Sequence, residues 1–381
     1  MRTVADVVII GAGATGCSIA FHLARLKRTR VIVVEKGSLA SGMTKRSGGM
    51  IRLSYPWESE ARLALASLGY FQNWKELVGS GCGFTRTGFV TVAQGETQAA
   101  QLEHQVAMLR RIGAKAEILS REQLGELQPA AHVDDVTLAA YEPESGYADP
   151  IAATQSLAAR AKKLGVSFHT GTFAKRVLVE RGRVFGVDTT TGEIETMSVV
   201  IAAGPWSDRL LKPLGVKIGI RSERAQVAFF ERPAELKAGH AAFMDSITGV
   251  YFRPHTFGLT LGGLTEWQSD AKPNPDQFED TVDQAYVQDV HRRIVARVPA
   301  MVNARYVRGH AGIYDTSPDG HAVLDRVPGI HGLVVAAGFS GSGSALAPAV
   351  GACIAELVTE GAASTVDLSP FGFARFGLEE C

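Results

Sequence analysis

The sequence lacks an excess of charge of either sign. Its 39 Lys and Arg residues balance its 39 Asp and Glu residues, so the formal net charge at pH 7 is +0. A surface that binds nucleic acid usually requires a basic excess. The basic run from Arg25 to Arg30 is interpreted as the solvated end of a helix, where cations suit the helix dipole. We therefore expect no nucleic-acid partner.

Cysteine and long hydrophobic runs are also scarce. Cys17, Cys82, Cys353 and Cys381 form neither a metal-ligand spacing nor a disulfide framework, which is typical of a reducing compartment and predicts no metal site. No apolar run approaches the roughly 18 residues of a membrane span. The N-terminus has no cleavable signal region. We expect a soluble, cytoplasmic protein with no membrane span.

The pattern of strands and helices predicts the fold class. At roughly 150 residues per domain, 381 residues predict two domains or three. Continuous apolar runs, typical of buried parallel strands, occur near the beginning, middle and end of the chain, and alternating patterns lie between them. We expect an α/β fold in which a discontinuous Rossmann-like domain is interrupted by an α+β domain on an antiparallel sheet. The ranges are 1–78, 146–215 and 312–381 for the first domain, and 79–145 and 216–311 for the second.

Two local predictions concern the connections between these elements. Residues 58–77 are expected to form one helix. Residues 168–187 are expected to form hairpin strands about a turn at Arg181 and Gly182.

A dinucleotide-binding motif follows the first apolar run. Gly11, Gly13 and Gly16 have the G-x-G-x-x-G spacing and precede apolar residues at helical spacing. The first glycine permits a tight turn, the second lets backbone approach a pyrophosphate, and the third lets helix and strand pack closely. The N-terminus of the helix offers N–H groups and partial positive charge to the diphosphate.

Glu35 completes the motif, because it ends the second strand about twenty residues further on. Its carboxylate can accept hydrogen bonds from both ribose hydroxyls, which argues against NADP. The motif and Glu35 together do not separate FAD from NAD.

A resemblance separates the two cofactors. Residues 38–52 resemble the flavin loop of the D-amino-acid-oxidase superfamily, most closely its sarcosine oxidase, dimethylglycine dehydrogenase and glycine oxidase branches. Residues 171–174 and 202–207 are similar to segments of this family that lie beside the nucleotide. Residues 308–320 and 338–343 resemble the segments that wrap the isoalloxazine. The resemblance covers most of the chain in order and implies an FAD-dependent oxidoreductase.

The resemblance also implies a set of FAD-binding residues. The turn at 338–343 lies between a buried strand and a helix, so it presents N–H groups to the negative charge of reduced flavin. The complete set is Gly11, Gly13, Ala14, Thr15, Gly16, Glu35, Lys36, Thr44, Arg46, Ser47, Gly48, Gly49, Met50, Ala174, Ala203, Gly204, Trp206, Gly312, Gly338, Phe339, Ser340, Gly341, Ser342 and Gly343.

Two departures from the family predict how FAD is held. Some relatives attach flavin covalently through a Cys two residues before the Tyr of the C-terminal segment, or through a His in the first loop. Gly312 and Arg46 stand at these positions here. We therefore expect non-covalent FAD.

The family oxidises the C–N bond of a small amine or amino acid, of the sarcosine, glycine or N-methyl amino acid type. Hydride transfer to flavin gives an imine that water hydrolyses. Arg52 aligns with the Arg that binds the substrate carboxylate in the sarcosine oxidase branch. Ala345 stands where that branch has a Lys, so half of this carboxylate site is missing.

Further substrate residues are expected on two strands. Tyr251 matches a tyrosine that lines the substrate pocket of relatives, and Arg253 and His255 share its face of the strand. Arg308 and His310 form another pair on one face. We expect Arg52 and the first four of these residues to form the catalytic set. The alternative is that Arg253 and Arg308 hold structural ion pairs.

The electron acceptor is left open between O2 and another acceptor. Alignment places Thr260 where the sarcosine oxidase branch has a Lys that promotes reaction with oxygen, and Leu264 where it has a pocket His. Two other functions are also open. One is a 2-hydroxy-acid dehydrogenase, and the other is an FAD-carrying β-type subunit with partner subunits.

Overall fold

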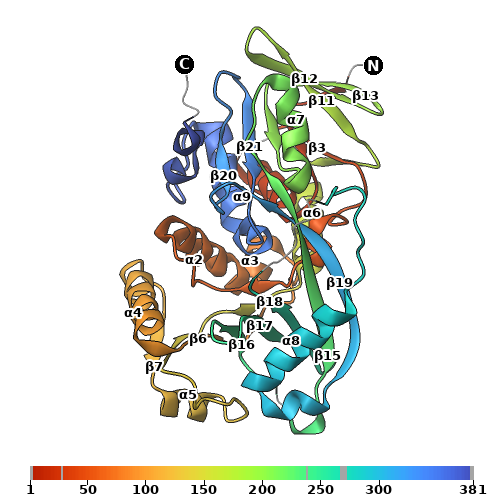
Figure 1. Ribbon diagram of the computed structural model, residues 1–381. Helices are drawn as coiled ribbons and strands as arrows, with labels where there is room; N and C mark the ends of the chain where they lie inside the picture. The colour runs from red at the N-terminus through yellow and green to blue at the C-terminus, as the bar shows by residue number, and fades with distance from the viewer. Residues whose placement is uncertain (1–2, 27–28, 237–238, 267–272, 378–381) are drawn as a thin grey trace.

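The computed structural model describes residues 3–26, 29–236, 239–266 and 273–377, and the structural statements below concern these residues (Figure 1). α1 (Ala14–Leu26) ends inside the basic run, with Arg25 in its last turn as expected. Lys27, Arg28 and Cys381 lie outside the described residues.

A six-stranded sheet forms the centre of the upper half of the molecule (Figure 1). All its neighbouring pairs are parallel except β20 with β21. Parallel strands need apolar cover on both faces, which explains their continuous apolar runs. The strand order is β10 (Ser167–Thr170), β3 (Val31–Glu35), β2 (Val7–Ile10), β14 (Val199–Ile201), β21 (Leu333–Ala337) and β20 (Val323–Arg326).

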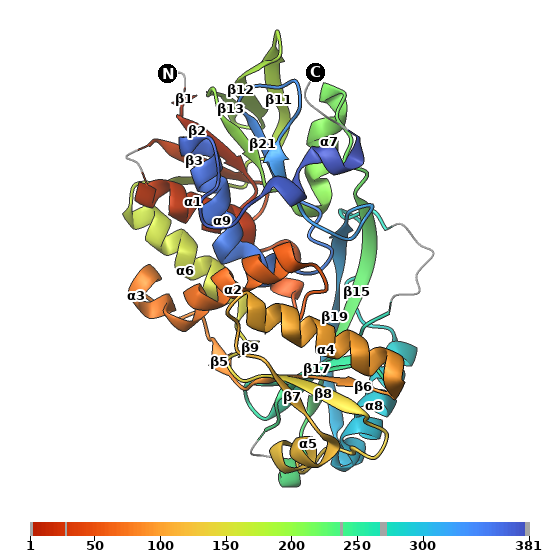
Figure 2. The same cartoon turned by 90° about the vertical axis from the view of Figure 1, so that its left-hand side faces the viewer.

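Helices cover one face of this sheet and a second sheet covers the other. Figure 2 shows α1 beside α6 (Pro150–Lys163) and α9 (Gly343–Glu360), with α2 (Glu58–Gln72) against the far end of α9. On the opposite face lie α7 (Ser207–Leu211) and a four-stranded sheet. Its order is β1 (Thr3–Val4), β13 (Gly192–Glu195), β12 (Arg183–Thr189) and β11 (Ala174–Glu180).

An eight-stranded, largely antiparallel sheet forms the lower half (Figure 1). One face packs on α8 (Gln284–Arg297) through Phe230, Phe252 and Val290. The other face is turned toward the upper half. The strand order is β19 (Arg305–Thr316), β15 (Arg221–Glu231), β18 (Leu259–Leu264), β17 (Val250–His255), β16 (Ala242–Asp245), β6 (Phe89–Ala93), β8 (Leu138–Glu142) and β7 (Glu117–Leu119).

The remaining elements connect these layers. A small sheet of β4 (Met50–Ile51), β9 (Gly146–Tyr147) and β5 (Thr85–Arg86) links the two halves. The other helices are α3 (Trp74–Val78), α4 (Gly95–Arg111) and α5 (Arg121–Leu127), and the 3-10 turns are η1 (Met43–Arg46), η2 (Gly204–Trp206), η3 (Lys212–Leu214), η4 (Ala234–Leu236), η5 (Pro299–Asn303), η6 (Ser369–Phe371) and η7 (Phe373–Phe376).

The two local predictions were correct only in part. The helix expected over 58–77 breaks at Asn73, which separates α2 from α3. The turn at Arg181 and Gly182 is present, with φ values of 49° and 72°, and joins β11 to β12. Phe168, however, belongs to β10 of the parallel sheet, because its strand pairs with β3 instead of β11.

The α/β class with an antiparallel sheet inserted is confirmed. The domain limits stay a prediction, and β19 runs across the one expected at residues 311 and 312. None of the described helices has both the length and the apolarity to cross a membrane. Cys17, Cys82 and Cys353 are free and buried, and burial raises the pKa of the Cys82 thiol to about 11.

A buried ion pair fixes α8 to the eight-stranded sheet. The Arg297 guanidinium donates from Nε to Asp245 (2.8 Å) and from Nη1 to Asp135 (2.8 Å). The side chains of Arg297 and Asp245 are both 0% exposed. Burial lowers the pKa of Arg297, but the bonds to the two carboxylates outweigh it and raise the pKa above its ordinary value.

We predict that Arg297→Met lowers the free energy of unfolding by about 3–5 kcal/mol, because it leaves a buried carboxylate without its cation. Urea denaturation would measure this change. Arg292→Met on the same helix removes an exposed partner of Asp289 and should cost less than about 1 kcal/mol. Equal effects of the two substitutions would contradict the prediction.

Candidate functional site

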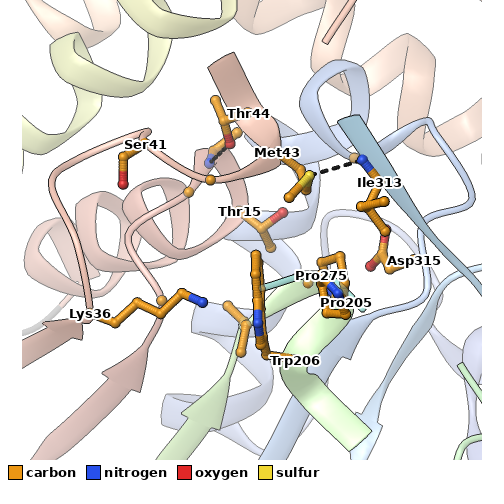
Figure 3. A pocket seen from close by; sticks show the side chains of 18 of the residues that line it. Thr15, Lys36, Ser41, Met43, Thr44, Pro205, Trp206, Pro275, Ile313 and Asp315 are labelled. Carbon is orange, nitrogen blue, oxygen red and sulfur yellow. Dashed lines mark hydrogen bonds between the residues drawn. The ribbon is translucent and has the colours of Figure 1, made fainter. Parts of the chain in front are cut away.

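A cavity of about 690 Å³ lies at the carboxyl ends of β2, β3 and β14 (Figure 3). This volume lies within the range of about 300–1,000 Å³ for small-molecule sites. Figure 3 shows Lys36 on one side of the cavity and Ile313 and Asp315 on the opposite side. The expected FAD-binding residues that line it are Gly11, Gly13, Ala14, Thr15, Glu35, Lys36, Thr44, Arg46, Ser47, Gly48, Ala174, Ala203, Gly204, Trp206, Gly312, Phe339, Gly341 and Gly343.

The glycine motif forms the first wall of the cavity. Gly11 has φ +110°, and a Cβ there would lie 2.3 Å from the Ala202 carbonyl oxygen. Gly16 does not line the cavity; a Cβ on it would lie 1.9 Å from the carbonyl oxygen of Gly11. The third glycine is therefore needed for packing, and it lets α1 begin directly at the sheet edge.

Glu35 stands beside this turn at the end of β3. Its Oε2 accepts the N–H of Ala12 (2.8 Å) and its Oε1 accepts the N–H of Gly37 (2.8 Å). These bonds hold the carboxylate at the cavity wall, and each oxygen keeps a further lone pair for a ligand hydroxyl.

The loop after β3 crosses the N-terminus of α1. The Thr44 hydroxyl in η1 accepts the N–H of Ala14 (3.0 Å), and the Ser47 and Ser344 hydroxyls share a hydrogen bond of 2.6 Å. Gly49 and Met50 do not line the cavity. They hold the loop in place, since a Cβ on Gly49 would lie 2.3 Å from the Ala148 carbonyl oxygen and Met50 pairs with Tyr147.

The turn at 338–343 is supported by Asp315. The N–H of Gly338 donates to Asp315 Oδ2 (2.8 Å), and the N–H of Ser340 donates to the Asp315 carbonyl (3.2 Å). Ser340 adopts φ 50°, which is uncommon for a residue other than glycine. Gly338, Ser340 and Ser342 shape the turn without lining the cavity.

Asp315 is itself a cavity residue that the sequence did not identify. Burial raises the pKa of its carboxyl to about 6, against the opposing effect of the Gly338 and Phe339 N–H groups. Its side chain can therefore change charge near neutral pH.

Arg46 and Gly312 contact each other across the cavity. A Cβ on Gly312 would lie 2.9 Å from the Arg46 Cβ. Arg46 and Gly312 stand at the two positions where relatives attach flavin covalently, and the Arg46 side chain fills the space beside Gly312. This packing leaves no room for a cysteine at 312 unless Arg46 moves.

The eight-stranded sheet meets the loop with one face. Gly48 lies against the side chains of Tyr251 and Leu261, since a Cβ on it would lie 3.8 Å and 3.9 Å from them. The register aligns Arg253 with Leu261, Leu261 with Phe229, and Phe229 with Arg308 across four neighbouring strands. Residues directly opposite in a sheet share a face, so Arg253 and Arg308 lie on the face that meets the loop.

The polar residues on this face hold the loop. Arg253 is 3% exposed, and its Nε donates to the Gly48 carbonyl (2.6 Å). The His310 Nε2 lies 3.3 Å from the Arg46 carbonyl oxygen. Arg253 and His310 thus meet carbonyl groups at the C-terminal end of η1 and just after it. Such carbonyl groups lack partners within the helix, so hydrogen-bond donors are favoured there.

Two arginines of this face have no acidic partner. Among the described residues, no carboxylate lies within 4.0 Å of Arg253 or Arg308. Arg308 is exposed and its guanidinium lies 3.9 Å from the centroid of the Phe229 ring. Burial and the charges of both arginines lower the pKa of His255 to about 4, and its Nδ1 lies 3.2 Å from Nη1 of Arg253. The alternative of structural ion pairs for the two arginines is therefore wrong for the described residues.

Arg52, which is expected to bind the substrate carboxylate, lies outside the cavity wall. Its Nη1 donates to the Ser54 carbonyl, and its guanidinium lies 4.1 Å from the centroid of the Tyr55 ring. It does not line the cavity, nor do Tyr251, Arg253, His255 and Arg308. The substrate roles of these five residues stay predictions.

Thr260 and Leu264 lie on the face of β18 that is turned away from the flavin loop. Thr260 pairs with Pro254 and is 0% exposed, with its hydroxyl 2.9 Å from His240 Nε2. Leu264 pairs with Val250 on the same side. Both residues lie on the face toward α8, because side chains alternate along a strand. Leu261, the next residue along β18 after Thr260, lies on the opposite face, against Gly48 of the flavin loop.

Comparison with known proteins identifies the family of the chain. The family model described as FAD dependent oxidoreductase, DAO, matches residues 6–357. The chain belongs to this DAO family of FAD-dependent oxidoreductases. It is 30% identical to FAD-dependent oxidoreductase domain-containing protein 1 of Bos taurus, over 98% of this chain and 85% of that protein. It is 27% identical to glycine oxidase of Geobacillus kaustophilus, over 97% of both chains. The L-proline dehydrogenase from P. horikoshii superposes with a TM-score of 0.91 over 100% of both chains, at 26% identity.

The cavity fits the FAD of this family. The N-terminus of α1 and Thr44 would hold the diphosphate. Glu35 would bind the ribose, and the turn at 338–343 would offer N–H groups to the isoalloxazine. The cavity is also lined by residues that the sequence did not identify, because they come from a segment without a motif: Pro275, Asp276, Phe278 and Asp280.

We predict a pH-dependent contribution of Asp315 to stability. Its folded-state pKa of about 6 is above its ordinary value of 3.8, so the folded state binds this proton more tightly. The contribution is fully present below about pH 4 and is lost as pH rises through about 6. Denaturation of wild type and Asp315→Asn at pH 4 and pH 7 would measure it.

From pH 4 to pH 7, the free energy of unfolding of wild type should fall relative to that of Asp315→Asn by up to about 3 kcal/mol. This follows from 1.36 kcal/mol for each unit by which the pKa is raised. A constant difference would refute the titration. Asp319→Asn serves as a control, because the pKa of Asp319 is lowered to about 2 and it stays ionised over this range.

Proposed function

We propose that this protein oxidises the C–N bond of a small amine or amino acid that carries a carboxylate, of the sarcosine, glycine or N-methyl amino acid type. Bound FAD supplies the acceptor for a hydride equivalent from the carbon next to nitrogen. The resulting imine is hydrolysed by water. Two relatives named above, a glycine oxidase and an L-proline dehydrogenase, carry amino acids in their names and support this substrate class.

The proposal rests on Arg253 and Arg308, which have no acidic partner among the described residues. Arg253 is buried, where a cation is normally paired with an anion, and Arg308 is exposed, so its guanidinium can meet a ligand from solvent. Arg253 and Arg308 lie on the sheet face that meets the flavin loop, so a substrate carboxylate there would sit near the flavin end of the cavity. Guanidinium groups bind carboxylates with two parallel hydrogen bonds. The position of Arg308 outside the cavity wall suits a group that reaches substrate from the sheet.

The titratable groups of the site favour a neutral amine substrate. His255 is unprotonated at neutral pH, and its Nδ1 already faces an arginine donor. Burial raises the pKa of Tyr251 well above 10, and the pKa of Tyr314, with which it shares a hydrogen bond, is also raised by burial. Neither phenol acts as a base near pH 7. We therefore expect turnover to rise with pH as more substrate amine loses its proton.

The residues of β18 bear on which acceptor takes the electrons from reduced flavin. Leu261 contacts the flavin loop from β18, and it offers no cation to attract superoxide or peroxide charge. This supports an acceptor other than O2. A 2-hydroxy-acid dehydrogenase and a β-type subunit of a larger enzyme are the alternatives that the first experiment distinguishes.

The first prediction concerns the substrate class. Purified protein is mixed under anaerobic conditions with N-methyl amino acids, D- and L-amino acids, and 2-hydroxy acids, and loss of flavin absorbance near 450 nm is followed. We expect bleaching by amino compounds only. Bleaching by hydroxy acids alone would support a 2-hydroxy-acid dehydrogenase. No bleaching by any compound would support a β-type subunit of a larger enzyme. The rate of recovery in air then tests O2 as acceptor.

The second prediction concerns Arg308. We expect Arg308→Ala to raise the KM of the best amino-acid substrate about 10- to 100-fold, equivalent to about 1.4–3 kcal/mol. The KM of the matching methyl ester should change little, because it lacks the carboxylate charge.

Arg305→Ala is the matched control, since Arg305 lies on the same strand but pairs with Glu231. Equal KM changes for the acid and its ester would refute the carboxylate role. FAD content of each variant is measured as well, so that loss of cofactor is not mistaken for loss of substrate binding.

The third prediction concerns attachment. We propose that FAD is held without a covalent bond, since Gly312 and Arg46 occupy the two attachment positions of relatives. Acid precipitation should leave the yellow chromophore in the supernatant. A coloured pellet would show a covalent bond.

A further inference from the structure

A segment of the eight-stranded-sheet half forms part of the wall of the FAD cavity. Residues 274–280 precede α8, yet Pro275, Asp276, Phe278 and Asp280 line the same cavity as the glycine motif. The segment reaches from the lower half of the molecule to the upper half (Figure 1), and Figure 3 shows Pro275 among the side chains that line the cavity. We call residues 274–280 the cofactor strap.

Asp276 anchors one end of the strap. Its Oδ1 accepts hydrogen bonds from Lys36 Nζ (2.8 Å) and Trp206 Nε1 (2.7 Å), and its Oδ2 accepts one from Arg209. Lys36 Nζ also lies 3.5 Å from the centroid of the Trp206 ring. Burial opposes ionisation of Asp276, but the three donors outweigh it and lower its pKa to about 2.

Asp280 anchors the other end. Its carboxylate pairs with Arg46 Nη2 (3.1 Å), and its carbonyl accepts the N–H of Ala311 (2.8 Å). Phe278 lies under the same guanidinium, 5.2 Å from its ring centroid to the Arg46 Cζ. The strap is therefore tied to the flavin loop as well as to the nucleotide half.

The two anchors correspond to the two ends of the cofactor. Lys36 follows Glu35, the expected ribose ligand, and Trp206 lies in the turn beside the nucleotide. Arg46 contacts Gly312 at the expected flavin end. All the cations come from the FAD-binding half and both carboxylates come from the strap. A ligand that extends between the two ends lies in the cavity that Pro275, Asp276, Phe278 and Asp280 help to line.

We propose that the cofactor strap, through Asp276 and Asp280, retains FAD in its cavity, so that the rate of FAD release is set by opening of these two anchors. The charges suit this role. Two strap carboxylates close to an anionic diphosphate would repel it, but Lys36, Arg209 and Arg46 neutralise them. The inference concerns FAD alone and does not depend on the proposed amine substrate.

The test compares FAD release from wild type and Asp276→Asn. Holoprotein is diluted, bound and released FAD are separated by ultrafiltration at successive times, and the filtrate absorbance near 450 nm is measured. This is done in about 50 mM and about 500 mM NaCl, where screening differs strongly. We expect the variant to release FAD about fivefold faster at low salt, equivalent to about 1 kcal/mol. Wild-type release should accelerate with salt, and release from the variant should respond less.

Asp289→Asn is the matched control. Asp289 is a half-exposed aspartate bonded to Arg292 and Arg293 on α8, and it does not line the cavity. The Asp289→Asn variant should release FAD at the wild-type rate. Asp280→Asn tests the second anchor independently, so the proposal stays testable if Asp276→Asn does not fold. Release from either strap variant at the wild-type rate, with wild-type salt dependence, would overturn the proposal.

Discussion

At the carboxyl ends of β2 and β14 the backbone of Gly11 lies against the carbonyl group of Ala202, and Gly16 lies against Gly11 in turn. No side chain fits between these groups. The first turn of α1 therefore sits at the sheet edge, with its N-terminal N–H groups directed at the cavity. The positions of Glu35 and of the loop through Thr44 follow from this contact, because both bond to the N–H groups of residues 12 and 14.

The cavity is closed by segments that lie far apart in the sequence. The glycine motif supplies one wall, β19 and the turn at 338–343 supply another, and the strap forms part of a third. Small residues are frequent in the lining, which lets backbone groups reach the cavity. Charged side chains are used where the two halves of the molecule meet. Arg253 covers the Gly48 carbonyl, and the strap carboxylates meet Lys36 and Arg46.

Much of this could be predicted from the sequence, because a glycine-rich turn depends on local conformation and leaves a local pattern. The buried strands of the parallel sheet were predictable for the same reason, through their continuous apolar runs. Asp315 was not identified as a site residue, because its role depends on a hydrogen bond to Gly338 across 23 residues of chain. The strap residues carry no motif, and only tertiary contacts bring them to the cavity.

Register was the other limit of prediction. The sequence did not reveal which face of β18 carries Thr260, whose side chain points toward α8. The alternation of Tyr251, Arg253 and His255 was predictable, since it needs only the two-residue repeat of a strand. Which face they occupy relative to the cofactor could be decided only by the sheet as a whole.

β19 connects the sheet face that meets the flavin loop with the wall of the FAD cavity. Arg308, His310, Gly312 and Tyr314 follow each other at every second position, all paired in order with β15. The first two lie on the sheet face that meets the flavin loop and the last two line the FAD cavity, over about 20 Å at about 3.4 Å per residue. Insertion of one residue between them would turn every side chain beyond it to the opposite face. Side chains on this strand can therefore be exchanged one at a time, but a change in its length would shift every residue that lines the cofactor cavity relative to the sheet.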